Sequence, residues 1–226
     1  IKIYSTYTKD TIFYKTAKCV RVKKGGPAFF MEKIFKNSGL KYKIYACRAQ
    51  ISINVDGKGE RGVLHSPLSE RKIGNVKTGD ILIISTVATE WFLNSKTSKN
   101  IRIFLDIQGY VRDSRQNKFS KNFISLSDVF CLKGNKKEIS ALPKTLISKQ
   151  KGKCLVVTRG DKGVDVYFKN KKYKFMSNKI KAEDTIGAGD IFFAAFIVSF
   201  IKSGGDVKQS GDFAVKKVNF FLSAKK

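Results

Sequence analysis

The stretch that decides the fold is Asp184-Thr185-Ile186-Gly187-Ala188-Gly189-Asp190, which runs directly into Ile191-Phe192-Phe193-Ala194-Ala195-Phe196-Ile197-Val198-Ser199-Phe200. The apolar run predicts a buried helix, and the small residues before it predict a tight loop at the helix start. Backbone N–H groups without helical partners and the positive end of the helix dipole meet at such a point. The loop therefore predicts an anion hole formed by Gly187, Ala188 and Gly189.

A carboxylate at this helix start, Asp190, needs an explanation of its own. The structural interpretation is that Asp190 is simply part of a tightly packed helix start. The chemical reading is a general base, because a carboxylate beside a bound phosphate can accept the proton of a hydroxyl that attacks phosphorus. Asp184 and Thr185 precede the small residues of the loop. Thr185 is a candidate for binding phosphate, and Asp184 is a candidate for binding metal.

Working outward from this loop, short β-branched strands alternate with helical stretches, such as Pro27 to Asn37 and Asn135 to Leu142. This alternation predicts an α/β fold of three layers, with a mostly parallel central sheet flanked by helices. In such sheets ligands bind beyond the carboxyl ends of the strands. The predicted strands are Ile1–Tyr4, Tyr42–Cys47, Asp80–Ser85, Ile101–Asp106, Val129–Leu132, Cys154–Thr158 and Val164–Phe168.

Two segments, residues 11–24 and 49–64, break the alternation and predict antiparallel hairpins that form a small β flap, or lid. The turn string Asp56-Gly57-Lys58-Gly59 supports the second hairpin. No repeat or Pro/Ser-rich linker interrupts the chain. We therefore expect residues 1–226 to form a single α/β domain that carries this flap.

The net charge is the unusual feature of the composition, because 45 Lys and Arg against 18 Asp and Glu give +27. The basic residues are scattered as pairs and triplets, without the patch or arm that nucleic-acid binding favours. A solvated Lys-rich surface is the simpler interpretation, and a nucleic-acid partner is disfavoured. The four cysteines have no zinc or redox spacing, so we expect reduced, packed thiols.

The segment from Asp184 to Phe200 resembles the second signature of the pfkB family of carbohydrate kinases, also called the ribokinase family. The resemblance implies a ribokinase-like fold, with ATP and Mg²⁺ as cofactors and Asp190 as the catalytic base. Earlier in the chain, Asn135 and Glu138 resemble the Asn-x-x-Glu element of that family, which organises magnesium through water. An ordinary capping box would give the same spacing.

A second group of residues resembles the nucleotide and substrate sites of that family. Thr158, Gly160 and Gly163 match its strand and Gly-rich turn beside the ATP phosphates, although an ordinary hairpin fits too. Asp10 and the turn Gly25-Gly26 match residues that bind sugar hydroxyls in that family. The alternative interpretation is a surface Asp and an ordinary tight turn. Many members have Asn where this chain has Phe30, which argues against a ribose-type or fructose-phosphate-type substrate.

The run Asp106-Ile107-Gln108-Gly109-Tyr110-Val111-Arg112 resembles an Asp-x-Gln-Gly-x-x-Arg run of the inositol-kinase-like and archaeal branch. It implies substrate roles for Asp106, Gln108 and Arg112, whereas an Asp at a strand end also often caps a turn.

These resemblances together favour a kinase for a small sugar or cyclitol, including myo-inositol-like acceptors. Alternatives are a nucleoside kinase of the same family and a basic nucleic-acid-binding module on a kinase-like fold. A dinucleotide-dependent oxidoreductase is disfavoured, because its glycine fingerprint follows the first strand.

The partners expected from this interpretation are a polyol and a nucleotide, with a monomer or homodimer as the assembly. We expect a cytoplasmic protein from the reduced cysteines. We also expect it to be soluble and not exported, because no apolar run reaches the length of a membrane helix and no leader opens the chain. The start at Ile1, without Met, indicates a trimmed or partial chain.

Overall fold

The computed structural model describes residues 1–56, 59–74, 76–93, 100–111, 128–178, 180 and 182–225. Arg112 lies outside these ranges. The strands are β1 (Lys2–Tyr14), β2 (Cys19–Gly25), β3 (Lys43–Asp56), β4 (Gly59–Leu64), β5 (Arg71–Lys72), β6 (Ile81–Ser85), β7 (Trp91–Phe92), β8 (Arg102–Asp106), β9 (Val129–Asn135), β10 (Cys154–Thr158), β11 (Val164–Phe168) and β12 (Lys171–Phe175). The helices are α1 (Gly26–Phe35), α2 (Gln108–Val111), α3 (Lys136–Ser140), α4 (Lys144–Gly152), α5 (Ala188–Lys202) and α6 (Val207–Ser223), with a 3-10 turn η1 (Gly160–Lys162).

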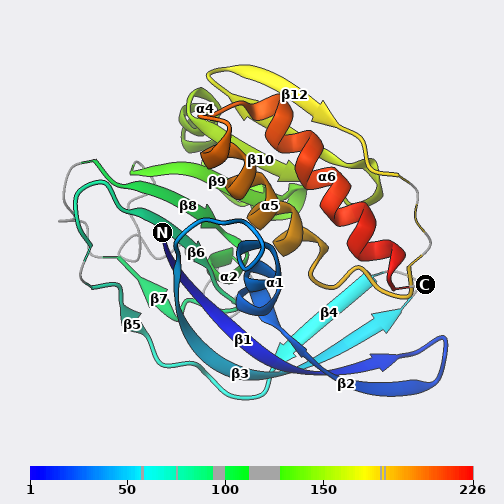
Figure 1. Cartoon of the computed structure of the whole chain (residues 1–226). Helices are drawn as coiled ribbons and strands as arrows, with labels where there is room; N and C mark the ends of the chain where they lie inside the picture. Colours follow the sequence, from blue (N-terminus) through cyan, green and yellow to red (C-terminus); the bar gives the residue numbers. More distant parts are fainter. Residues whose placement is uncertain are drawn as a thin grey trace.

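A ten-stranded sheet runs through the molecule in the order β12-β11-β10-β9-β8-β6-β1-β3-β4, with β2 paired to β1. The six strands from β10 to β3 are parallel, and antiparallel strands close both ends. Figure 1 shows α5 and α6 packed together across one face of this sheet, beside α1. The predicted α/β fold with a mostly parallel sheet is confirmed.

Each buried strand sends alternate side chains to two apolar clusters, as the two-residue period of a strand requires. In β8, Phe104 packs in a cluster with α5, whereas Ile103 and Leu105 pack in a cluster with α3 on the opposite face. The sheet is therefore the middle of three layers. Helix α5 is buried along almost its entire length, which explains why its sequence is apolar on all sides.

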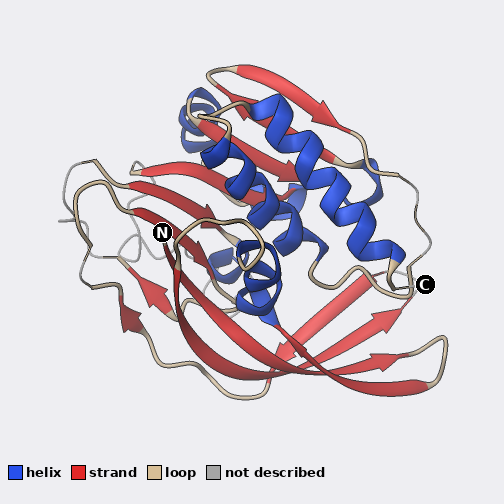
Figure 2. Cartoon of the chain, in the orientation of Figure 1, coloured by secondary structure: helices blue, strands red, loops and turns tan. Residues whose placement is uncertain are grey.

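The flap is made by the outer halves of β1 and β3 together with β2 and β4 (Figure 2). Residues Thr8–Tyr14 of β1 pair antiparallel with β2, and Ile51–Asp56 of β3 pair antiparallel with β4. The two predicted hairpins are present. The predicted strand ends at Tyr4 and Cys47 are wrong, because β1 and β3 continue into the flap and pair in parallel along their whole length. The β1 sequence contains no Gly or Pro that could break it.

Other elements follow the predictions with small shifts. The helix expected at Pro27–Asn37 is α1, with Pro27 in its first turn, and the helix expected at Asn135–Leu142 is α3 with Asn135 as its N-cap. All four cysteines are free thiols, and three are buried. Among the described residues, the helices are too short or too polar to cross a membrane.

Candidate active site

A cavity of about 980 Å³ opens between the carboxyl ends of the parallel strands and the flap. It lies where ligands are expected on a sheet of this type. It brings together residues as far apart in the chain as Thr8 and Asp190. The predicted site residues that line it are Asp10, Gly26, Gln108, Asn135, Glu138, Thr158, Thr185, Gly187, Gly189 and Asp190.

The predicted anion hole lies at the start of α5. Gly187 is the N-cap residue with a left-handed backbone (φ 86°), and no side chain caps this helix end. A Cβ on Gly187 would lie 2.4–2.5 Å from ring atoms of Phe30, so the ring requires glycine here. Exposed backbone donors and the dipole of this 15-residue helix together suit a phosphate.

Asp190 stands in the first turn of α5 and lines the cavity with 9% of its surface exposed. Asp190 is therefore almost fully buried at the wall of the ligand space. This placement agrees with that required of a base that acts on a bound hydroxyl.

Asp10 and the Gly25-Gly26 turn form one unit at the edge of the flap. A Cβ on Gly25 would lie 1.9 Å from Asp10 Oδ2, and Gly26 has φ 84° with Thr6 O only 2.4 Å from its Cβ position. Thr8 Oγ1 donates to Asp10 Oδ1. Burial raises the pKa of Asp10 above its usual value, although the bond from Thr8 opposes that shift. Gly25 thus lets the backbone pack against a buried carboxylate that lines the cavity, and Gly26 lets it pack against the backbone of β1.

Asn135 and Glu138 form a complete capping box at the start of α3. Glu138 N donates to Asn135 Oδ1 at 2.9 Å, and Asn135 N donates to Glu138 Oε2 at 2.8 Å. The structural alternative noted from the sequence is therefore present. Both residues also line the cavity, so the box fixes their side chains beside the ligand space.

Asp184 is engaged by protein donors rather than lining the cavity. Tyr14 Oη donates to its Oδ2 at 2.6 Å, and Lys225 Nζ and Ile186 N donate to its Oδ1. Burial would raise the pKa of Asp184, but the bonds from Lys225 and Tyr14 outweigh burial and hold it below its usual value. Asp184 thereby ties the flap, the anion loop and the end of the chain together.

Further contacts join the flap to the anion loop. Thr185 donates its N–H and its hydroxyl to Glu60 Oε1 of β4, the hydroxyl at 2.9 Å, and Arg21 of β2 pairs with Glu183. Ile186 packs with the small apolar cluster of the flap. The flap therefore holds the loop that leads into α5.

Six of the described predicted residues do not line the cavity, and Asp184 and Gly25 are two of them. Gly160 and Gly163 form the turn between β10 and β11, Ala188 is the first residue of α5, and Asp106 is fully buried and paired with Lys133. Gly25 lies behind Asp10, as described above. The roles predicted for these residues stay predictions.

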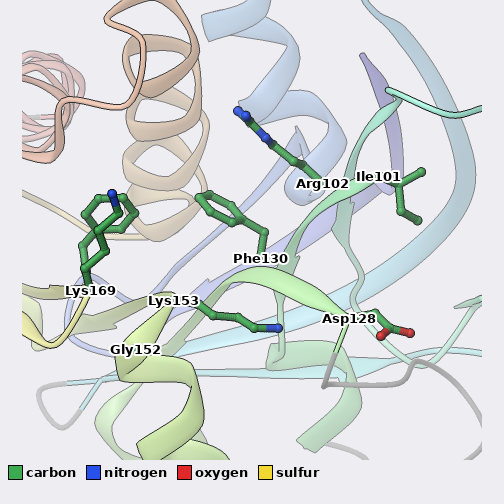
Figure 3. A pocket seen from close by; sticks show the side chains of 8 residues that line it. Ile101, Arg102, Asp128, Phe130, Gly152, Lys153 and Lys169 are labelled. Atoms are coloured by element: carbon green, nitrogen blue, oxygen red, sulfur yellow. The ribbon is translucent and has the colours of Figure 1, made fainter. Parts of the chain in front are cut away.

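A second hollow, of about 360 Å³, lies at the opposite edge of the sheet, where β8, β9 and β10 begin (Figure 3). Its lining includes Arg102, Phe130, Lys153 and Lys169 and none of the predicted site residues. The described candidate residues that line a hollow therefore all line the first cavity.

Sequence reasoning missed several contributors to the site. Lys133, Tyr14, Glu60 and Lys225 all touch predicted residues but were not singled out. For Lys133 a signal exists, because a Lys in the middle of a buried strand is unusual. The other three act through long-range contacts that no local pattern reveals.

The oxygen donors on the cavity wall suit magnesium in particular. In the described part of the chain, no three His, Cys, Asp or Glu side chains cluster closely enough to hold a metal alone. Mg²⁺ usually keeps several waters and binds through one or two protein oxygens and the substrate phosphates. Asn135 and Glu138, fixed on the cavity wall near the anion hole, fit that mode of binding.

Comparison with known proteins agrees with this geometry. The family model for pfkB family carbohydrate kinases matches residues 76–217, more than half of the chain. The chain therefore belongs to the pfkB family of carbohydrate kinases.

Two curated relatives match over shorter segments. The chain is 44% identical over 59 residues to a probable fructokinase-5 of Arabidopsis thaliana and 36% identical over 73 residues to a nucleoside kinase of Methanocaldococcus jannaschii. These alignments cover 26% and 32% of this chain. They span only 18% and 24% of the relatives' own lengths.

Solved structures match over almost the whole chain. The crystal structure of a nucleoside kinase of Methanocaldococcus jannaschii has a TM-score of 0.72 at 19% identity, covering 99% of this chain and 92% of that one. A pyrophosphate-dependent kinase in the ribokinase family, complexed with a pyrophosphate analog and myo-inositol, has a TM-score of 0.69 at 15% identity, covering 98% and 95%. These similarities establish a ribokinase-like fold.

Proposed function

We propose that the chain is an ATP- and magnesium-dependent kinase that phosphorylates a hydroxyl of a small sugar or cyclitol. The observation that carries this proposal is the single cavity that places Asp190, the glycines of the anion hole and Asp10 around one ligand space. Each group has a separate task in phosphoryl transfer, and the three groups line the same space. Membership of the pfkB family supports the same reaction class.

In the proposed reaction, Asp190 accepts the proton of the acceptor hydroxyl. The hydroxyl oxygen forms a bond to the γ-phosphorus as the bond from that phosphorus to the bridging oxygen breaks, and ADP leaves with the electron pair. The backbone N–H groups of Gly187, Ala188 and Gly189 stabilise charge on the transferred group, aided by the dipole of α5.

Magnesium, when bound, offsets the negative charge of the phosphates. Asn135 and Glu138 would hold it, through water, on the wall beside Thr158. Thr158 ends β10 opposite Asn135 in the parallel pairing, so the two side chains start from neighbouring strand ends. Thr158 and Thr185 are the candidate contacts to the nucleotide phosphates.

The acceptor would bind at the flap side of the cavity. A carboxylate can accept hydrogen bonds from two hydroxyls, so Asp10 suits a polyol. Gly26 and Gln108 line the same space and supply backbone and amide groups. The flap hairpin, bonded to the anion loop, would close over the bound acceptor.

A second candidate acceptor is a nucleoside, which an apolar part of the cavity favours. Pro27, Phe30, Ile51, Ile53 and Ile186 line the cavity together. Such a surface suits the flat face of a base better than a polyol covered in hydroxyls. The similarity to a nucleoside kinase of Methanocaldococcus jannaschii adds support.

An ADP-release assay with ATP and Mg²⁺ across cyclitols, pentoses, hexoses and nucleosides tests both candidates. The main proposal expects at least one polyol to stimulate ADP release strongly. Turnover with nucleosides alone would select the second candidate. The Phe30→Asn variant should then lose nucleoside turnover, because the apolar contact with the base is gone. Absence of acceptor-dependent ADP release with every class would refute the kinase proposal.

A further inference from the structure

Lys133 is a buried cation in a cavity whose charged lining residues are mostly carboxylates. It lies near the carboxyl end of β9, lines the cavity and is only 4% exposed. Among the described residues, seven Asp and Glu side chains are buried, and Lys133 is the only Lys or Arg among the buried residues. A lone buried lysine is retained only where its charge is compensated.

The ammonium of Lys133 is held in place by Asp106. Lys133 Nζ donates to Asp106 Oδ2, and Asp106 is fully buried at the end of β8. Gln108 N donates to Asp106 Oδ1 at 3.2 Å, which fixes the carboxylate in turn. The register places Asp106 directly opposite Lys133 in the sheet, so both partners start from rigid, neighbouring strands.

The same ammonium lies under the first turn of α5. A Cβ on Gly189 would come within 3.3 Å of Lys133 Nζ, so glycine leaves room for the lysine beside the helix start. The ion pair with the buried carboxylate of Asp106 makes Lys133 a cation. Asp190 follows Gly189 directly in this first turn, and it lines the same cavity as Lys133.

We propose that Lys133 is a positioning residue for phosphoryl transfer, whose ammonium, anchored by Asp106, holds the Asp190 carboxylate in place at the start of α5. The inference rests on the proposed kinase function. A carboxylate that must stand beside incoming phosphates is repelled by them, and a fixed cation behind it offsets that repulsion. Asp106 then acts through Lys133, in place of the substrate contact expected from the sequence.

Three variants test this role against a purely structural one. Lys133→Met removes the charge at similar length but leaves Asp106 buried and unpaired, which is strongly destabilising. The double variant Lys133→Met/Asp106→Asn removes both charges and should fold, since replacing a buried ion pair by neutral groups is often tolerated. Asp106→Asn alone removes the anchor and leaves Lys133 buried without its partner, which is also destabilising, so the double variant is the main test. Lys137→Met, at an exposed position of α3, is the matched control.

The assay is acceptor-dependent ADP release, with kcat and KM measured separately and the melting temperature recorded for every variant. We expect the double variant to melt within a few degrees of the wild type. Its kcat should fall about 50-fold or more, while both KM values stay within about threefold. This pattern is expected when a variant loses an interaction that matters in the transition state but not in substrate binding. Asp106→Asn should lower kcat about tenfold, and Lys137→Met should match the wild type.

Three results would overturn the inference. A double variant with wild-type kcat would make the pair purely structural. A rise in the KM for ATP at unchanged kcat would make Lys133 a direct ligand of the nucleotide. A rise in the acceptor KM alone in Asp106→Asn would make Asp106 a substrate contact. Failure of the wild-type chain to release ADP with any acceptor would instead refute the kinase function, so the two failures are distinguishable.

Discussion

The buried and the exposed parts of this chain carry opposite charges. The whole sequence has a net charge of +27, yet the buried charged groups of the described residues are seven carboxylates and Lys133. The cavity, like the interior, has more acidic than basic side chains. Five carboxylates and two cations line it (Asp10, Glu60, Glu70, Glu138 and Asp190, with Lys133 and Arg61). The charge that stands out in the composition thus lies mainly on the surface, whereas the proposed chemistry depends on a few acids.

The largest effect is expected from the buried acid at the start of α5. Asp190→Asn keeps the shape of the side chain but removes the base, so kcat should fall by about 10³. ATP affinity, measured by calorimetry with the variant, should change by less than about threefold, because backbone groups form the anion hole. Turnover at the wild-type rate would show that the acidic interior does not carry the chemistry.

The next effect is expected from the acid on the flap side of the cavity. Asp10→Asn should raise the KM for the acceptor about 100-fold, because a charged hydrogen-bond acceptor is worth about 1.5–3 kcal/mol. The KM for ATP should stay unchanged. Steady-state kinetics with each substrate varied in turn measures the two separately. An equal rise in both KM values would place Asp10 outside the acceptor site.

The fold itself should respond to the loss of Asp184. Asp184→Asn removes the ion pair with Lys225 and should lower the free energy of unfolding by about 2 kcal/mol at pH 7, which is a drop in melting temperature of about 4–8 °C. Asp161→Asn, at an exposed turn position, is the control.

The pH dependence of this difference has a defined sign. The pKa of Asp184 in the folded protein is below the usual 3.8, so its ionised form stabilises the fold above that pH. This stability is lost as the pH falls through the folded pKa. The difference between the wild type and Asp184→Asn should therefore shrink below pH 3.8. A difference that grows in acid would contradict the lowered pKa.

The smallest effect is expected from the basic surface. If the lysines only attract anions, raising NaCl from about 50 to about 300 mM should raise the KM for ATP about threefold while kcat changes little. The KM for a neutral acceptor serves as the internal control and should not move. An unchanged KM for ATP would leave the surface charge with no role in binding.

The sequence predicted the parts of the site that depend on local pattern. The loop from Asp184 to Asp190 predicts a helix start, because small residues precede a long apolar run. In the structure, α5 begins there and the loop borders the cavity. The parallel sheet follows from alternating strands and helices. Asn135 and Glu138 are predicted from their resemblance to the family's Asn-x-x-Glu element. That spacing cannot separate a capping box from a metal site, and the structure shows that the box is present.

The parts that were missed depend on tertiary contacts. Tyr14 reaches Asp184 across 170 positions, and Glu60 reaches Thr185 across 125. No local period links such residues. The continuous β1 and β3 were missed for a related reason, because a change from one pairing partner to another along a strand leaves no mark in its own sequence. Lys133 was the exception, since its place in a buried strand could have identified it.

Phosphorus-31 NMR of the wild-type chain with ATP, Mg²⁺ and the acceptor most active in the ADP-release assay tests the central claim most directly. The account predicts a new phosphomonoester signal that grows as the γ-phosphate signal of ATP declines by the same amount. Asp190→Asn should show neither change on the same timescale. Release of inorganic phosphate alone, or loss of ATP signal at equal rates in both proteins, would contradict transfer to a hydroxyl by this site.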